Sequence, residues 1–181
     1  MRRPQVQFVQ YVLNGVSVSP EEAEFVDRMG LFFEAMSGPR TMGRIYGWLL
    51  ICEPPEQSLA ELAATLHVSK ASVSTVIRPM SEGGLVERVP SSSRQHRYRI
   101  TEGGWTEVLR LQIDRLRMGV EAAEFGLKVL SPTRPDQVER LRNLRDFMAF
   151  TEQDARDGLM ERWQQYRREI RNEPEEGTDD D

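Results

Sequence analysis

Short polar side chains and cations occur together in residues 69–78. If a helix starts after Ser69, Val73 and Ile77 face a core, and a polar face remains on the opposite side. Near the helix start that face carries short side chains bordered by longer cations, which lets a helix enter the major groove of DNA. The candidate DNA-contacting residues of this face are Ser69, Lys70, Ala71, Ser72, Ser74, Thr75 and Arg78.

The start of this predicted helix carries no acidic side chain. Two other predicted helix starts are capping boxes, Ser19 with Glu22 and Ser58 with Glu61, and both place a carboxylate in the first turn. The helix after Ser69 keeps its N-terminal partial positive charge available to a phosphate. Ser69 and Ser72 are therefore candidates for phosphate contacts, and the alternative is a solvated helix of chance composition.

A predicted β-hairpin follows this helix. Residues 85–89 and 97–100 are typical of strands, and a polar loop over residues 91–95 joins them. Arg94 and Arg97 are expected to be exposed at the hairpin, where an arginine can enter a narrow minor groove. Arg94 is favoured because Arg97 lies where the returning strand begins. The alternative is an ordinary charged turn.

The charge distribution favours a polyanionic partner for this region. The chain carries a net charge of −5, but residues 173–181 alone hold six carboxylates, so the remainder is close to neutral. Residues 69–101 contain six basic side chains against two acidic ones, a balance of +4. A local basic block is what a nucleic acid meets. A winged helix that only binds another protein would not need this block, and it is the main alternative.

Other chemistry has little support in the residue types. One cysteine and two histidines exclude a disulfide framework and disfavour a metal site, and no phosphate loop or nucleophile elbow is present. Cys52 follows an apolar helical stretch and is expected to be an inert core thiol, while His67 is expected in a turn. We therefore predict no enzyme activity, no cofactor, no membrane segment and a cytoplasmic location.

The elements that must position these residues are mostly helical. The predicted fold class is mainly α with a small β-hairpin wing, a winged helix-turn-helix with long dimerisation helices. Gly43 and Gly47 lie four residues apart on a predicted helix, which indicates close packing against another backbone. The predicted organisation is an irregular arm (1–18), an N-terminal helix (19–38), the winged domain (39–101), C-terminal dimerisation helices (102–172) and an acidic disordered tail (173–181).

Two long helices are predicted after the hairpin. The first is capped by Thr101 and repeats apolar residues at a spacing near 3.5, as in a coiled coil. The second follows residues 131–133 and also carries an apolar side. Pairing these helices across a two-fold axis would place two winged domains about one DNA turn apart, so we expect a homodimer.

Several segments resemble the MarR family of bacterial transcriptional regulators. They are LA at 62–63, VSKASVS at 68–74, MSEGGLVER at 80–88 and ITEGG at 100–104, while GPR at 38–40 and GRIYGWL at 43–49 resemble the GbsR-type branch. The resemblance covers about residues 20–130. It implies a dimer whose terminal helices pair, binding to a palindromic operator, and control by a small ligand, with repression as the expected effect. Ser92 departs from the family pattern, because an acidic residue often stands there.

The GbsR-type resemblance also suggests an osmoprotectant-like effector, such as a quaternary ammonium compound. Tyr46, Trp48 and Trp105 are the candidate effector-binding residues, since aromatic faces attract such cations. The simpler interpretation is that these three rings pack in the core and at a helix junction.

Overall fold

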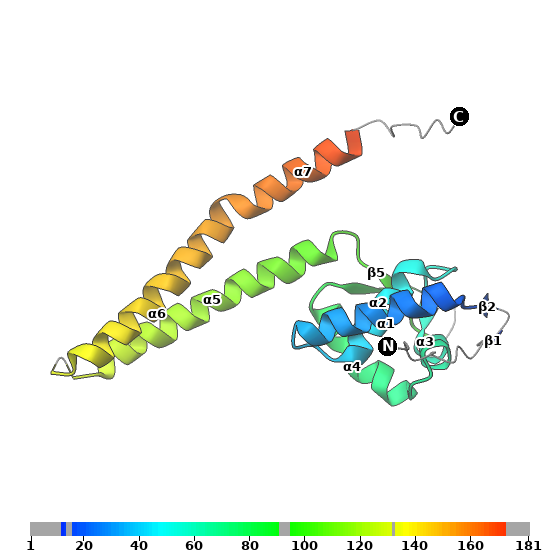
Figure 1. The fold of residues 1–181 in the computed structure, drawn as a ribbon, viewed down its shortest axis with the longest axis horizontal. Coiled ribbons are helices and arrows are strands. Elements are labelled where there is room, and N and C mark those ends of the chain that lie inside the picture. The colour runs from blue at the N-terminus through cyan, green and yellow to red at the C-terminus, as the bar shows by residue number, and fades with distance from the viewer. Residues whose placement is uncertain (1–11, 14–15, 91–94, 132, 173–181) are drawn as a thin grey trace, which may run out of the picture. The chain divides into compact units, whose positions relative to one another are not determined.

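The computed structural model describes residues 12–13, 16–90, 95–131 and 133–172. The chain forms two compact units, which divide between Val108 and Leu109 (Figure 1). The predicted mainly helical class with a small antiparallel sheet is confirmed. No helix in the described ranges is long and apolar enough to cross a membrane.

Helices α1 (Pro20–Ala35) and α2 (Arg40–Ile51) open the first unit. The predicted capping box of α1 is present: the Ser19 side chain accepts from the Glu22 N–H, and Glu22 accepts from the Ser19 N–H. Gly43 and Gly47 of α2 both lie against α1, with Gly43 facing its backbone. The close helix–helix approach predicted from these two glycines is therefore confirmed.

The helix-turn-helix consists of α3 (Leu59–Leu66) and α4 (Lys70–Glu82). The Ser58–Glu61 capping box starts α3, and His67 ends it in the left-handed conformation, with φ of 53°. The predicted place of His67 in the turn between α3 and α4 is thus confirmed. Gly83 and Gly84 end α4 as expected.

The wing strands β4 (Val86–Val89) and β5 (Arg97–Ile100) are antiparallel, with Val86 opposite Ile100 and Val89 opposite Arg97. The prediction of a two-stranded hairpin is incomplete. A third strand, β3 (Gln57–Ser58), pairs with β5 and gives the order β3-β5-β4. Because β3 directly precedes α3, the sheet is joined to the first helix of the helix-turn-helix.

One hydrophobic core holds these elements together. Its most deeply buried side chains come from α2, α3, α4 and β4, so the two helices of the helix-turn-helix pack on α2 and on the base of the wing. The fully buried members are Ile45, Leu62, Val73, Met80 and Val86.

Helix α5 (Gly104–Val129) carries the chain into the second unit. The prediction that Thr101 caps this helix is wrong. Gly103 adopts a positive φ of 74°, and the helix begins at Gly104, two residues after the start that a Thr101 cap implies. The Thr101 side-chain oxygen is buried with no hydrogen-bond partner among the described residues, while its carbonyl accepts from the Gly104 N–H.

The second unit contains the rest of α5, then α6 (Pro135–Asp154), a π-helical segment η1 (Ala155–Leu159) and α7 (Met160–Asn172). Helices α5 and α6 run side by side (Figure 1), with Gly119 against Met148 and Gly126 against Leu141. An Arg156–Asp114 ion pair at 2.7 Å adds a link between η1 and α5. The second predicted long helix is thus interrupted by η1.

Short strands β1 (Val12–Leu13) and β2 (Val16–Ser17) pair antiparallel near the N-terminus. This part of the predicted irregular arm is therefore a short hairpin. The Asn14-Gly15 sequence between the strands is a common composition of two-residue hairpin loops, and it could have predicted these two strands. Residues 1–11 of the predicted arm and the acidic tail at 173–181 lie outside the described residues.

Candidate nucleic-acid interface

Helix α4 presents two chemically different faces. Its buried side chains are all apolar: Val73, Val76, Ile77 and Met80. The opposite face is exposed at every predicted position, namely Ser69, Lys70, Ala71, Ser72, Ser74, Thr75 and Arg78. The structure therefore brings these seven residues together on one continuous surface of the first unit.

The start of α4 is capped without a carboxylate. The Ser69 hydroxyl accepts from the Ser72 N–H at 3.0 Å and lies 2.8 Å from the Ser72 hydroxyl. No acidic residue occurs in the first turn, whereas α1 has Glu21 and Glu22 there and α3 has Glu61. The first turn of α2 also lacks an acid. The N-terminus of α4 thus retains the partial positive charge expected from the sequence.

Arg78 has an acidic neighbour on the same helix. Its Nε donates to Glu82 at 2.9 Å, and both side chains are largely exposed. A surface pair of this kind is weakly held and can exchange its partner, so Arg78 can still turn towards a polyanion. Thr75 is partly engaged as well, because its hydroxyl donates to the Ala71 carbonyl at 2.9 Å.

The wing contains the two other predicted DNA-contacting residues. Arg94 lies outside the described residues. Arg97 is described, and the expectation that it is exposed is wrong: only 25% of its side chain is accessible. Its Nη2 donates to the Glu56 carbonyl at 2.6 Å and lies 3.1 Å from the Glu61 carboxylate. The sequence did not reveal these partners of Arg97, because the short strand β3, which brings Glu56 and Glu61 beside it, has no visible pattern in the sequence.

The basic block is less positive than a count of charges indicates. Three of its cations form ion pairs: Arg78 with Glu82, Arg97 with Glu61 and Arg99 with Glu87. Glu61 lies outside residues 69–101 and was not included in the local balance. Lys70 and Arg88 are exposed on α4 and β4 and carry their charge to the surface.

The three candidate effector-binding aromatics do not form one site. Tyr46 and Trp48 are core side chains, 5% and 4% exposed, whereas Trp105 is 37% exposed. Tyr46 and Trp105 form an edge-to-face ring pair with centroids 5.8 Å apart. Burial raises the pKa of Tyr46 above its usual value, and a hydrogen bond with the Trp105 side chain opposes the rise. Phe32 and Phe33 of α1 complete this ring cluster, which the sequence analysis did not identify.

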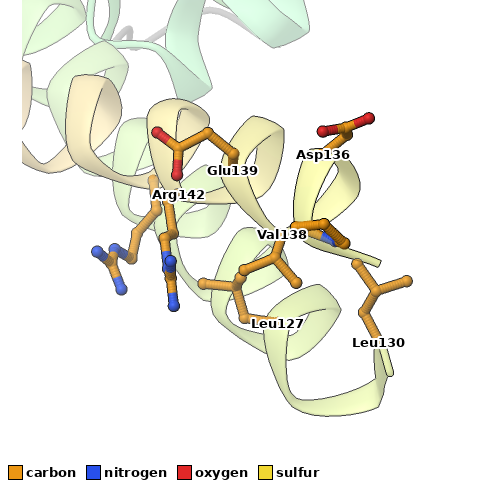
Figure 2. Close-up of a pocket in the computed structure, with 8 residues that line it drawn as sticks. Leu127, Leu130, Asp136, Val138, Glu139 and Arg142 are labelled. Carbon is orange, nitrogen blue, oxygen red and sulfur yellow. The ribbon is translucent and has the colours of Figure 1, made fainter. Parts of the chain in front are cut away.

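A separate cavity of about 660 Å³ lies in the second unit, where α5 meets α6 (Figure 2). The side chains of Leu127 and Val138 point towards each other there. Two arginines and two acidic residues surround this apolar patch, and none of the three candidate aromatics lines it. The lining residues are Leu127, Leu130, Pro135, Asp136, Val138, Glu139, Arg142 and Arg145.

The Cys52 thiol is buried at the end of α2, and its Sγ lies 3.9 Å from the Leu49 carbonyl. Burial raises its pKa to about 11, so the reactive thiolate is scarce near neutral pH. The expectation of an unreactive core thiol agrees with this environment.

This chain is similar to several known proteins. A family model described as an MmpR5-like MarR family transcriptional regulator matches residues 103–167, and a winged helix DNA-binding domain model matches residues 51–104. The HTH-type transcriptional regulator MmpR5 of Mycobacterium tuberculosis is 34% identical over 145 residues, which cover 80% of this chain and 88% of that protein. A crystal structure of a transcriptional regulator, also 34% identical, covers 81% of this chain and 99% of its own, with a TM-score of 0.71. MepR of Staphylococcus aureus is more distant, 17% identical over 72% of this chain and 93% of its own, with a TM-score of 0.38.

The helix pair α3–α4, the strand order β3-β5-β4 and the polar face of α4 define a winged helix-turn-helix protein of the DNA-binding class. Within that class, the chain belongs to the MarR family of transcriptional regulators and is MmpR5-like. It is a DNA-binding transcriptional regulator, as the sequence analysis predicted.

Proposed function

We propose that this regulator acts as a homodimeric repressor in the cytoplasm and binds a palindromic operator with α4 of each protomer in the major groove. The exposed face of α4 is the observation that carries this proposal. It combines short side chains and an acid-free first turn near the helix start with Lys70 and Arg78 at its edges. Short groups let the helix approach base edges, and the cations meet phosphates on either side.

The second unit supports the homodimer. Its helices expose large apolar side chains, including Phe125 at 65%, Phe147 at 65% and Phe150 at 70%. Met118 and Val129 add to this surface, and Tyr166 and Ile170 extend it along α7. Soluble proteins seldom leave so much apolar area in water, and a second copy of the same helices would cover it.

A small-molecule effector is the other half of the proposal. The partly exposed rings of Trp105 and Phe32 offer aromatic surface to a cation or an apolar compound in the first unit. The GbsR-like branch and its quaternary ammonium ligands stay a prediction. A calorimetric titration with choline and with betaine tests them: absence of heat, together with unchanged DNA affinity, would contradict this effector class.

Placing a charge on the α4 face tests the DNA-binding mode. Ser74→Glu adds a carboxylate in the middle of the face, and we expect it to weaken binding to the duplex upstream of the gene by about a hundredfold or more. Gln112→Glu adds the same charge at an exposed position of α5 and is the matched control. Equal affinities of the two variants would contradict the use of α4 as the reading helix.

A further inference from the structure

The geometry points to Arg97 as a positioning residue that fixes the wing against the helix-turn-helix, in place of the DNA contact that its sequence position suggested. This inference rests on the proposed function, because it concerns how the two DNA-reading elements are held together. Arg97 is the first residue of β5, opposite Val89 at the outer end of the β4–β5 ladder. It therefore lies at the end of the ladder nearer the wing tip, where β3 also pairs with β5.

One nitrogen of Arg97 meets two acceptors from outside the wing. Its Nη2 donates to the Glu56 carbonyl at 2.6 Å and lies 3.1 and 3.3 Å from the two Glu61 carboxylate oxygens. The Arg97 backbone is also paired with Ser58 of β3. Side chain and backbone thus attach the same end of β5 to the segment that begins α3.

Glu61 is itself held in place. One of its oxygens accepts from the Ser58 N–H at 2.6 Å, and the Ser58 hydroxyl accepts from the Glu61 N–H at 3.2 Å. The carboxylate that binds Arg97 is therefore the capping group of α3. Because α3 packs on α4, the angle of the wing is linked through Glu61 to the helix that reads DNA.

Arg97 differs in this respect from its neighbour Arg99. Arg99 pairs with Glu87 of β4, within the wing, and half of its side chain is exposed. Of these two arginines, Arg97 is the one that forms a hydrogen bond and an ion pair with residues outside the wing, whereas Glu56 contributes only a minor electrostatic attraction at Arg99. Arg99→Met is therefore a matched control, since it removes the same charge from the same strand.

Hydrogen exchange on the full-length protein without DNA tests the link directly. In Arg97→Met and in Glu61→Gln, we expect exchange of the β5 amides to accelerate about tenfold more than exchange of the α2 amides in the same variant. Glutamine still accepts from Ser58, so the cap of α3 is retained. Arg99→Met should change β5 exchange by less than about twofold. Wild-type β5 exchange in Arg97→Met, or an equal acceleration of the β5 and α2 amides, would overturn the inference.

Binding to the upstream duplex and to a shuffled duplex of equal length tests whether the position of the wing affects specific DNA binding. A misplaced wing should weaken binding of Arg97→Met to the upstream duplex about tenfold or more, with little loss on the shuffled one. Glu61→Gln should weaken it too, and the double variant should be no worse than either single variant. If Arg97 contacts DNA itself, Glu61→Gln strengthens binding, Arg97→Met loses affinity for both duplexes, and the inference is wrong. If the wild-type protein does not prefer its upstream duplex, the proposed function fails, and the exchange experiment alone decides the role of Arg97.

Discussion

Gly43 of α2 lies against the carbonyl of Met29 in α1: a methyl group added at Gly43 would overlap that oxygen and come within 2.9 Å of the Gly30 Cα. The two helices can approach this closely only because neither glycine carries a side chain. Gly47, one turn further along α2, faces the Met29 side chain in the same way. This contact holds α1 onto the helix that supports the helix-turn-helix.

We predict that Gly43→Ala destabilises the protein by about 2 kcal/mol or more, although alanine favours a helix by about 1 kcal/mol over glycine. Thermal unfolding followed by circular dichroism measures the change. Gly119→Ala is the control, because its new methyl group would meet only the flexible Met148 side chain, with the sulfur 3.1 Å away. That variant should keep or slightly raise the unfolding temperature. A wild-type unfolding temperature for Gly43→Ala would contradict the close packing.

Arg78→Ala should weaken binding to the operator by about 1–3 kcal/mol and flatten the preference at one base pair, because Arg78 borders the reading face of α4. Binding to a set of single-base operator variants measures both effects. Glu82→Gln is the informative companion: it removes the partner that holds Arg78 at 2.9 Å and should strengthen binding. Unchanged affinity in both variants would show that the far end of α4 does not reach the DNA.

Phe150→Glu should dissociate the proposed homodimer, because it places a charge where 70% of an aromatic side chain is exposed on α6 and would be covered by the second copy. We expect the dimer dissociation constant to rise about tenfold or more. Sedimentation equilibrium follows the mass between 20.9 kDa for the monomer and twice that value. Gln153→Glu adds the same charge at an exposed position of α6 and should leave the dimer intact. A wild-type protein that sediments as a monomer would contradict the dimer itself.

Stability should depend on the ionisation of Glu61. Burial raises the pKa of this carboxyl, but hydrogen bonds from Ser58 and the positive charge of Arg97 outweigh burial and leave the pKa below its ordinary value of 4.5. A carboxyl whose pKa is lower in the folded state adds stability above the unfolded-state pKa and loses it as the pH falls through the folded-state pKa. Wild type should therefore be more stable than Glu61→Gln near neutral pH, and the difference should shrink below about pH 4.

Denaturant unfolding of both proteins at a series of pH values measures this difference. The comparison isolates Glu61, because all other carboxylates titrate in both proteins. A stability difference that stays constant, or grows as the pH falls, would show that Glu61 is not stabilised as a carboxylate by Ser58 and Arg97.

Local signals predicted the helices and the buried and exposed faces of α4 well. The capping boxes at Ser19 and Ser58 start α1 and α3 where expected, because a cap satisfies backbone N–H groups within its own turn. The burial of Val73 and Ile77 follows from helical spacing in the same way. Such features depend on residues three or four positions apart, which a single sequence displays.

The remaining features depend on contacts that are distant in the sequence or on short irregular elements. Arg97 was expected at the DNA, and its actual partners were not foreseen because Glu56 and Glu61 lie 41 and 36 residues away in the sequence. They meet Arg97 only through β3, which is two residues long and too short to show alternation. The predicted start of α5 was too early, because Gly103 has a positive φ. A turn therefore separates Thr101 from the first residue of the helix. The π-helical segment η1 has no sequence signal that we recognise.

Binding of the wild-type protein to the duplex upstream of its gene, compared with a shuffled duplex at two salt concentrations, tests the central claim most directly. Fluorescence anisotropy should show a preference for the upstream duplex of roughly a thousandfold or more and a clear loss of affinity at the higher salt concentration. Equal, weak binding to both duplexes would contradict a specific operator in this region and the proposed reading of it by α4.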